Sequence, residues 1–420
     1  MNKIKRIIIT TDVLRDPECK DFSLQSNTVW TSTLFGDLCN EVTGLPIEVY
    51  DAKYMNGFVQ TLYKIYGFTD KIEQIDWLKI YNQTELEPLA KELFHVYFSD
   101  SLVIGFELPQ IFRRMFDNLG IFYIDIIHHP IRYLDDLLHG FSTNSLAIYN
   151  KLMKYQINPD IFKLQATYLK VKSRMRNINN NKIIPNSCII FGQTNVDRSI
   201  LKPDGSLARI LDYKEQIIEL SKKYKHIYFK PHPLNVNNKE TIEFLKSNIS
   251  NFSLLDYINA YDLYCNDSVE LYIALSSGSL YEAKYFGNNV QYLYKQPFEY
   301  GEDYINKSTS CYDWKEVFVS IYKNYLSYAF WSDILSEIIS VKSKDSICID
   351  THNIMRHALR ANWSYNDNNS FTLETFMNSV RYDIASLRSS VQNKPIAIPK
   401  GIGYKIWKHL NKKLKKQGII

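Results

Sequence analysis

The chain lacks the usual features of secreted, membrane-spanning and zinc-binding proteins. Its six cysteines are scattered over 420 residues without a Cys-x-x-Cys pair, which argues against a disulfide framework and a cysteine zinc site. No apolar run approaches the ~20 residues that cross a bilayer. The run IIITT after the basic N-terminus is too short for a signal sequence and predicts a first strand. We therefore expect a cytoplasmic protein with reduced thiols.

Several nucleotide-binding motifs are also missing. The sequence contains neither GxGxxG nor GxxxxGK[ST], and it has no Asp-x-Asp to hold a metal-bound diphosphate sugar. A single phosphate needs less charge neutralisation than a diphosphate, so these absences favour a metal-independent nucleoside monophosphate donor, with no metal and no cofactor. The net charge of +5 is too small to indicate nucleic-acid binding.

What is present indicates a two-domain α/β protein. Hydrophobic residues make up 45% of the chain and charged residues 23%, which is typical of a globular protein, and 420 residues exceed one ordinary core. Apolar strand-like runs alternate with helical patterns, as in parallel βαβ units. The expected strands are 7–10, 102–106, 121–127, 188–191, 226–230, 261–265 and 290–294, and the expected helices are 87–96, 110–118, 213–224, 238–247 and 279–286.

An Asn-rich stretch at 174–186 is the best candidate linker. It divides the chain into an N-terminal Rossmann-like domain, 1–180, for catalysis and the acceptor, and a C-terminal Rossmann-like domain, 187–365, for the donor. Residues 366–400 are expected to form helices that cross back.

The segment 401–420 is expected to be a basic amphipathic tail. Residues 404–417 carry six lysines, and Ile406, Trp407, Leu410 and Leu414 fall on one helical face. This pattern fits a helix lying on an anionic membrane surface. It equally fits a terminal helix docked on the protein by its apolar stripe.

Two polar clusters directly follow apolar strands in the second half, at FGQTNVDRSI (191–200) and YFKPHP (228–233). In open α/β sheets, ligands bind beyond the carboxyl ends of the strands. Asp197 could serve as nucleophile or base, and His232 could donate to a phosphate. The accompanying donor-binding candidates are Gln193, Arg198, Ser199, Lys230 and Pro233. The alternatives are a turn capped by Asp197 and an ordinary loop histidine.

A small-residue loop opens the predicted helix 279–286. Ser276, Ser277 and Gly278 could present backbone N–H groups to a phosphate at the positive end of that helix. Glu282, one turn later, could accept hydrogen bonds from ribose hydroxyls. The same spacing also fits a capping box between Ser279 and Glu282.

Two stretches of the N-terminal half supply further candidates. Glu107 in GFELP ends the strand 102–106, where a carboxylate would face the cleft or simply begin a helix. In HHPIRYLDD, Arg132 could pair with a substrate carboxylate, and His129 and Asp135 lie beside it. Asp135 and Asp136 are equally suited to opening a helix.

Taken in order, GQTNVDRSI, KPHP and SSGS resemble bacterial transferases of 3-deoxy-manno-octulosonic acid (Kdo) that use CMP-Kdo. The stretches GFELP and HPIRYLDD are most similar to retaining β-Kdo transferases of glycosyltransferase family 99. The resemblance covers roughly residues 100–290 and implies glycosyltransferase B (GT-B) architecture. The acidic motif of bacterial sialyltransferases, which share the His-Pro dipeptide, is missing.

The resemblance implies a double displacement. Asp197 would attack C2 of Kdo, while His232 and the Ser276–Ser277 loop stabilise the departing CMP. Glu107 would transfer the proton of the acceptor, a sugar hydroxyl of a lipid-linked O-antigen or capsule polysaccharide, and Arg132 would hold the Kdo carboxylate. Two alternatives stay open: an inverting CMP-sialic acid transferase, and a non-catalytic, membrane-attached scaffold of polysaccharide assembly.

Overall fold

A computed structural model describes residues 4–15, 22–68, 72, 75–175, 183–232, 238–255, 258–342 and 355. The expected helices at 366–400 and the basic tail at 401–420 lie outside these residues, as does most of the Asn-rich segment. Among the helices within the described ranges, none combines the length and hydropathy needed to span a bilayer.

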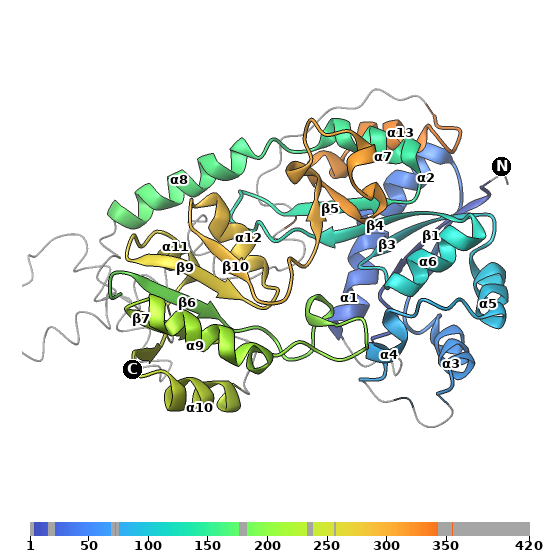
Figure 1. Cartoon of the computed structure of the whole chain (residues 1–420). Helices are drawn as coiled ribbons and strands as arrows, with labels where there is room; N and C mark the ends of the chain where they lie inside the picture. The colour runs from blue at the N-terminus through green and yellow to red at the C-terminus, as the bar shows by residue number, and fades with distance from the viewer. Residues whose placement is uncertain are drawn as a thin grey trace, which may run out of the picture. The chain divides into compact units, whose positions relative to one another are not determined.

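The first sheet has seven strands in the order β11-β12-β5-β4-β3-β1-β2, and Figure 1 labels its members β5, β4, β3 and β1. Strands β2, β1, β3 and β4 run parallel, and β5 is antiparallel to both β4 and β12. The strands are β1 (Arg6–Thr11), β2 (Ile47–Tyr50), β3 (Ser101–Phe106), β4 (Phe122–His128), β5 (Leu138–Thr143), β11 (Glu299–Tyr300) and β12 (Val317–Tyr322).

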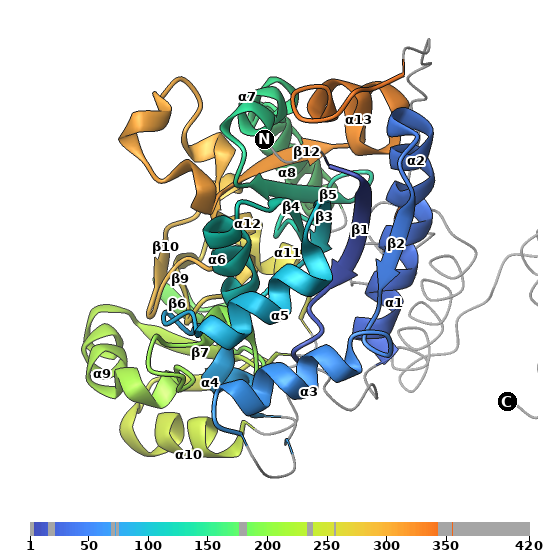
Figure 2. The ribbon, with the colours of Figure 1, turned by 90° about the vertical axis from the view of Figure 1, so that its right-hand side faces the viewer.

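Helices cover both faces of the first sheet, as Figure 2 shows for the two sides of β1. Alternation along the strands divides the apolar side chains between two cores: Ile8 and Val103 face α3 to α6, whereas Ile7 and Ile9 face α2, α7 and α13. The helices are α1 (Phe22–Thr31), α2 (Asp37–Thr43), α3 (Asn56–Ile65), α4 (Trp77–Tyr81), α5 (Pro88–Phe98), α6 (Gln110–Leu119), α7 (Leu146–Leu152) and α13 (Tyr328–Leu335).

The second sheet has five strands, all parallel, in the order β10-β9-β6-β7-β8. Its strands are β6 (Ser187–Phe191), β7 (His226–Lys230), β8 (Phe252–Leu254), β9 (Val269–Ala274) and β10 (Val290–Tyr292). Its helices are α8 (Asp160–Met175), α9 (Lys214–Lys223), α10 (Lys239–Asn248), α11 (Ala260–Tyr264) and α12 (Gly278–Tyr285). The predicted fold class is confirmed: the protein is α/β, with two Rossmann-like sheets as in GT-B architecture.

The boundary between the two sheets differs from the expected division at 187–365. After β10, the chain returns to the first sheet, where β12 pairs with β5 and β11 pairs with β12. The N-terminal sheet is therefore completed by residues 299–322. The apolar run VFVSIY of β12 indicates a strand, but nothing local in it indicates which sheet it joins.

Two local predictions were wrong. The segment 261–265, expected as a strand, is the short helix α11, because Asn259 caps it by accepting the Tyr261 N–H at 2.9 Å. The strand that was expected at 261–265 is instead β9, which begins eight residues later, at Val269. No helix begins at Asp135 and Asp136: Asp136 is buried and accepts the Leu137 N–H at 2.7 Å, ahead of strand β5.

A buried carboxylate, Glu302, connects the returning segment to both parts of the chain. Its Oε1 accepts from Tyr281 Oη of α12 at 2.7 Å and lies 2.9 Å from His129 Nε2. Its Oε2 accepts from Ser320 Oγ of β12 at 2.5 Å and from Gln156 Nε2 at 3.2 Å. Each carboxylate oxygen of Glu302 therefore has two hydrogen-bond donors, and the four donors come from four different segments of the chain.

Candidate functional site

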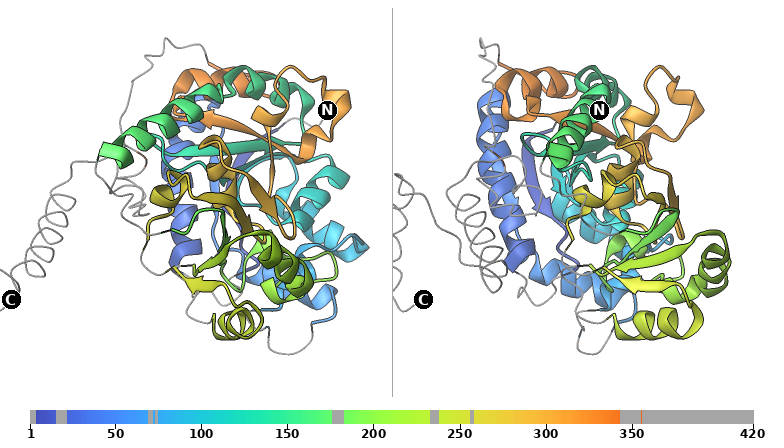
Figure 3. Two further views of the ribbon diagram at one scale, coloured as in Figure 1. Left: turned by 60° about the vertical axis from the view of Figure 1, so that its left-hand side comes forward. Right: turned by 90° about the vertical axis from the view of Figure 1, so that its left-hand side faces the viewer.

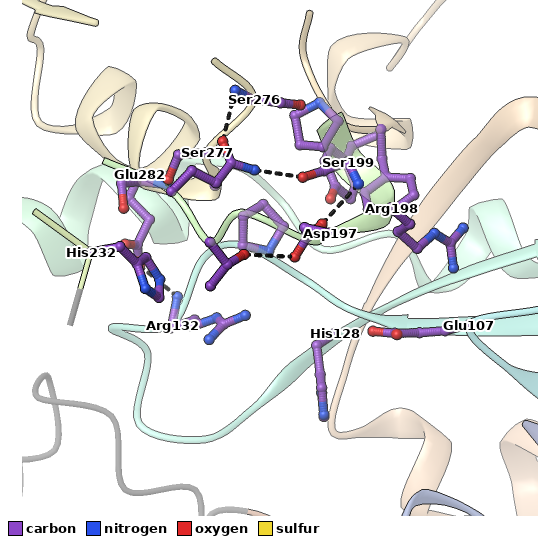
Figure 4. A pocket seen from close by; sticks show the side chains of 18 of the residues that line it. Glu107, His128, Arg132, Asp197, Arg198, Ser199, His232, Ser276, Ser277 and Glu282 are labelled. Carbon is purple, nitrogen blue, oxygen red and sulfur yellow. Dashed lines mark hydrogen bonds between the residues drawn. The ribbon is translucent and has the colours of Figure 1, made fainter. Parts of the chain in front are cut away.

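The polar strand ends of both sheets line one cavity of about 310 Å³ (Figure 4). The second sheet contributes the loops after β6, β7 and β9, and the first sheet contributes the loops after β1, β3 and β4. Of the predicted site residues, the cavity brings together Glu107, Arg132, Gln193, Asp197, Arg198, Ser199, His232, Ser276, Ser277, Gly278 and Glu282.

Asp197 begins the short 3-10 helix Arg198–Ile200 in the loop after β6. Its Oδ1 accepts the Ser199 N–H at 2.8 Å, so the capping role that the sequence suggested is real. Within the described part of the chain, the hydrogen bond of its Oδ2 is a long one, 3.5 Å, from Thr194 Oγ1. One carboxylate oxygen is thus oriented by the cap, and the other belongs to the cavity wall, where it could attack an electrophile.

Gln193 connects the loop after β6 with the loop before α12. Its Nε2 donates to Ser199 Oγ at 2.6 Å, and its Oε1 accepts the Ser276 N–H at 3.1 Å. The side chain therefore fixes the relative position of the Asp197 loop and the serine loop, which holds the two parts of the cavity wall in register (Figure 4).

His232 lies just beyond the end of β7, beside Glu282 and Arg132 in Figure 4. Burial lowers the pKa of His232 below its ordinary value of 6.5, although the nearby Asp197 carboxylate opposes this shift. An imidazole with a lowered pKa is mainly neutral at pH 7, and it would gain a proton, and with it a strong hydrogen bond, when a phosphate binds.

The two strand ends approach closely at Gly192. A Cβ atom there would lie 2.9 Å from the His232 backbone nitrogen and 3.2 Å from Pro231 Cα. Both neighbours are backbone, so a methyl group could fit only if the loops after β6 and β7 separated.

We predict that Gly192→Ala lowers the free energy of unfolding by about 1–3 kcal/mol, as overpacking usually does. Chemical denaturation would measure the loss. Gly57→Ala is the matched control, because Gly57 lies in α3 with no atom within 4 Å of the added Cβ. Equal stability of the two variants would contradict the close approach.

The serine loop begins α12 and presents its N-terminus to the cavity. Ser277 is the N-cap, accepting the Ser279 N–H at 3.2 Å, so the alternative interpretation, a capping box that begins at Ser279, does not describe this helix start. Ser276 Oγ is buried and has no hydrogen-bond partner among the described residues. Together with the first N–H groups of the helix, this hydroxyl suits a phosphate.

Glu282 supports the turn after β4. Its Oε1 accepts the Arg132 N–H at 2.9 Å and the Tyr261 hydroxyl at 2.8 Å. The carboxylate therefore positions the backbone of Arg132, whose guanidinium belongs to the cavity lining. Gly278 packs against the same turn, since a Cβ there would lie 2.8 Å from Pro130 Cβ.

Glu107 follows β3 in a left-handed conformation, with φ of +57°. Such a backbone costs ~1–3 kcal/mol for a residue other than glycine, and it occurs often at functional sites. The turn is held by the Glu107 N–H, which donates to Ile126 O at 2.8 Å, and by the Leu108 N–H, which donates to Asp125 Oδ1 at 2.9 Å. The strained turn points the Glu107 carboxylate into the cavity.

Arginines balance the carboxylates that follow β1 and β3, Asp12 and Glu107, and the carboxylate of Asp125 within β4. Arg15 lies 2.9 Å from Asp12 Oδ2 and 3.4 Å from Glu107 Oε2. Burial raises the pKa of Asp12, and it raises the pKa of Asp125 to about 6. Arg198, from the opposite wall, adds positive charge to this group and lowers both carboxyl pKa values in part.

Three predicted residues lie outside the cavity. His129 is buried: its Nδ1 accepts the Ile131 N–H at 3.0 Å, so Nε2 carries the proton that it donates to Glu302. Asp135 pairs with Lys323 at 3.0 Å. Lys230 ends β7 and does not line the cavity, although its charge contributes to the lowered pKa of His232. Pro233 lies outside the described residues.

The sequence reasoning missed several lining residues, most notably Arg15 and His128. Glu107 was predicted from the strand-end rule, by which ligands bind beyond the carboxyl ends of the strands in an open α/β sheet. Arg15 follows β1 closely, so the same rule could have predicted it. His128 stacks on Trp30 at 5.9 Å, and burial lowers its pKa well below the ordinary value. Within the described ranges, no three histidine, cysteine or acidic residues are grouped as metal ligands.

No protein-family model and no curated protein matches the chain. Among solved structures, it is similar to two structures of KpsC from Thermosulfurimonas dismutans and to an epimerase. The β-Kdo 2,7 transferase is 13% identical, with a TM-score of 0.31, and 56% of this chain and 74% of that chain are covered. The β-Kdo 2,4 transferase is 12% identical, with a TM-score of 0.34, and the covered shares are 68% and 79%.

The third structure is the UDP-GlcNAc 2-epimerase of Neisseria meningitidis bound to UDP-GlcNAc. It is 12% identical, with a TM-score of 0.25, and 69% of this chain and 82% of that chain are covered. At these identities and scores, no functional conclusion rests on any of the three likenesses.

Proposed function

We propose that the protein is a retaining glycosyltransferase that moves Kdo from CMP-Kdo to a sugar hydroxyl of a lipid-linked surface polysaccharide. One observation carries the proposal: a single cavity gathers Asp197, His232 and the serine loop from three neighbouring strand ends of one parallel sheet, opposite Glu107 of the other sheet. A nucleophile, a phosphate site and a second carboxylate are what a double displacement needs.

In the first step, an oxygen of Asp197 forms a bond to C2 of Kdo as the bond from C2 to the phosphate oxygen breaks. CMP leaves with the bonding electron pair. His232, Ser276 Oγ and the N-terminus of α12 would stabilise its phosphate, because each supplies a donor to a growing negative charge. Arg132 is the candidate for the Kdo carboxylate, since its guanidinium reaches the cavity from the side of the first sheet.

In the second step, the acceptor hydroxyl attacks C2, and the bond to Asp197 breaks. Glu107 takes the hydroxyl proton, which its position on the opposite wall permits. Two inversions at one carbon give net retention. The basic tail at 404–417 would hold the enzyme on an anionic membrane near a lipid-linked acceptor.

The proposal is tested by incubating the protein with freshly generated CMP-Kdo and, separately, with CMP-sialic acid, and measuring CMP release. Release from CMP-Kdo and not from CMP-sialic acid is expected, followed by transfer with retention at C2. The reverse preference, with inversion, would support the sialyltransferase alternative. Absence of CMP binding by calorimetry would favour the non-catalytic scaffold.

We further predict that CMP binds more tightly as the pH falls. Burial lowers the pKa of His232 below its ordinary value, so the imidazole must take up a proton to pair with the phosphate, and a lower pH favours this uptake. The CMP phosphate titrates near pH 6 as well, so the informative quantity is the difference between wild type and His232→Gln.

Calorimetric titrations with CMP between about pH 5 and 8, the range in which histidine and phosphate groups ordinarily titrate, should show a steeper pH dependence for wild type than for His232→Gln. His226→Gln is the control, because His226 lies at the opposite end of β7, where its Nε2 is 2.9 Å from Ser253 Oγ. Parallel profiles for wild type and His232→Gln would remove His232 from the phosphate site.

A further inference from the structure

A second cavity, of about 390 Å³, adjoins the first and shares Arg198, Pro297 and Phe298 with it. We call it the cationic cavity, because its lining includes Arg113, Arg114, Arg198 and Lys295. Among the described residues, two carboxylates, Glu299 and Glu316, line it as well. Four cations against two anions leave a formal excess of two positive charges.

Two of these cations are engaged by protein groups. Arg113 donates to Tyr123 Oη at 3.1 Å and lies 3.5 Å from Glu316 Oε2. Arg114 Nη1 donates to the carbonyl oxygens of Asn82 and Gln83, at 2.9 and 2.7 Å. The other two cations of the lining are Arg198 and Lys295.

Arg198 and Lys295 have polar atoms without protein partners. Arg198 Nη1 is buried and has no hydrogen-bond partner in the described part of the chain, and its guanidinium lies over the rings of Tyr81 and Phe298 at 5.7 and 5.0 Å. The Lys295 ammonium has no ion pair among the described residues and lies 5.0 Å from the Tyr294 ring centroid. Burial, with a contribution from Arg198, lowers its pKa.

A bound anion could accept a hydrogen bond from Arg198 Nη1 and pair with the Lys295 ammonium, and such charge-assisted hydrogen bonds are the strong ones. Flat aromatic faces beside the cations suit a sugar ring, because its C–H groups can pack on them. We infer that the cationic cavity binds an acidic sugar of the acceptor, with its carboxylate or phosphate between Arg198 and Lys295. This inference rests on the proposed function and adds that the acceptor is an anionic glycan.

The test is equilibrium binding by calorimetry in the presence of saturating CMP, which fills the donor cavity. The probes are methyl glucuronide and its neutral analogue, methyl glucoside. Wild type should bind the glucuronide about tenfold more tightly, the ratio that one charge-assisted hydrogen bond supplies. Lys295→Met should abolish that preference.

Lys307→Met is the matched control, because Lys307 also lies over a tyrosine ring, at 4.8 Å, but outside the cavity.

Equal affinity of wild type for both sugars, or a preference that persists in Lys295→Met, would overturn the inference. Inorganic phosphate binding as tightly as the glucuronide would also overturn it, because the cavity would then select a small anion and not a sugar. Failure of CMP to bind, with the sugar preference intact, would refute the proposed donor while the anionic subsite stands.

A separate observation concerns the outer face of α8. Five apolar side chains are exposed there: Ile161 (37%), Leu164 (66%), Tyr168 (58%), Val171 (53%) and Met175 (83%). Their spacing of three and four residues places them in one stripe, opposite the buried face formed by Phe162, Ala166 and Leu169. The helix runs beside α12, and it appears in green in Figure 3.

Cations flank this stripe on both sides. At 100° per residue, Lys172 falls on one side, and Lys163 and Arg174 fall on the other. The helix has four cations and one carboxylate. The ion pairs of Lys163 with Asp160 and of Arg174 with Asp267 are solvent-exposed and therefore weak. This charge disfavours a second copy of α8 and favours an anionic surface.

We propose that this face of α8 lies on an anionic lipid bilayer, with the apolar stripe at the headgroup boundary and the cations toward the phosphates. The face would act together with the basic tail or without it. It would place the enzyme flat against the surface that carries a lipid-linked acceptor.

Co-sedimentation of the full chain with vesicles of phosphatidylcholine and phosphatidylglycerol tests this face. Leu164→Ser with Val171→Ser should lower the vesicle partition coefficient at least about tenfold, because two exposed apolar groups lose their burial in lipid. Leu89→Ser with Val96→Ser on α5 is the matched control, since these residues are 63% and 71% exposed at the same spacing of seven.

Unchanged partition of the α8 double variant would overturn the proposal and leave vesicle binding to the tail. Light scattering provides the second measurement. A wild-type dimer that the α8 variant converts to a monomer would assign the stripe to a second copy and also overturn the proposal.

Discussion

Asp197→Asn should abolish the covalent adduct that wild type forms with CMP-Kdo in the absence of an acceptor. The expected wild-type result is an intact-protein mass increased by one Kdo residue. Asparagine can keep the cap on the Ser199 N–H, because it is as good an N-cap as aspartate, so the loop should keep its shape while the nucleophile is lost. Transfer should fall by at least about a thousandfold.

Asp204→Asn is the matched control for this experiment. Asp204 caps its own turn in the same way, accepting the Ser206 N–H at 2.9 Å, but it does not line the cavity. Wild-type rates in Asp197→Asn would exclude Asp197 as the nucleophile. An absent adduct in wild type, with CMP still released, would indicate direct displacement.

Glu302→Gln should cost about 3–5 kcal/mol of folding free energy, the usual penalty for breaking a buried charged network. The side chains of Glu302 and His129 are both completely buried. The four donors around Glu302 leave no acceptor for a new NH₂ group. Urea denaturation measures the loss.

Glu299→Gln is the control, because Glu299 is exposed and its carboxylate accepts a hydrogen bond from the Tyr304 hydroxyl. A loss below about 1 kcal/mol, the range of a surface substitution, would contradict the role of this network.

The same network predicts an acid limit to stability. Burial alone would raise the pKa of Glu302, but His129, Ser320 and Tyr281 more than offset it, so the pKa lies below the ordinary 4.5. A group with a lowered folded-state pKa stabilises the fold above its unfolded pKa, and this contribution is lost as the pH falls through the folded value. Glu302→Gln should therefore be closest to wild type in stability at pH values below the folded-state pKa of Glu302, which lies under 4.5.

The strand-end rule predicted most of the cavity, because it depends only on local sequence and on the geometry of parallel sheets. It located Asp197, His232, Glu107 and the serine loop, and all of them line one cavity. The rule failed to choose correctly between two successive histidines: His129 was predicted at the site, but His128 lines the cavity. Successive residues leave a strand end in opposite directions, and the sequence does not show which histidine faces the cavity.

Other features depended on long-range partners that no local pattern contains. Arg132 is positioned through its N–H by Glu282, a residue 150 positions away. The sequence of β12 is an ordinary apolar run that follows the second sheet along the chain, but β12 pairs with β5 of the first sheet. Sequence periodicity predicts that such a strand exists and not where it pairs.

That pairing has a consequence for how the protein is made. On the ribosome, strands β1 to β5 emerge long before residues 317–322, so the edge of β5 has no neighbour until most of the chain has been synthesised. An unpaired edge strand is a template for pairing with other chains. We therefore expect a fragment that ends at the Asn-rich segment to aggregate, and the N-terminal sheet to reach its final form only after the second sheet has been translated.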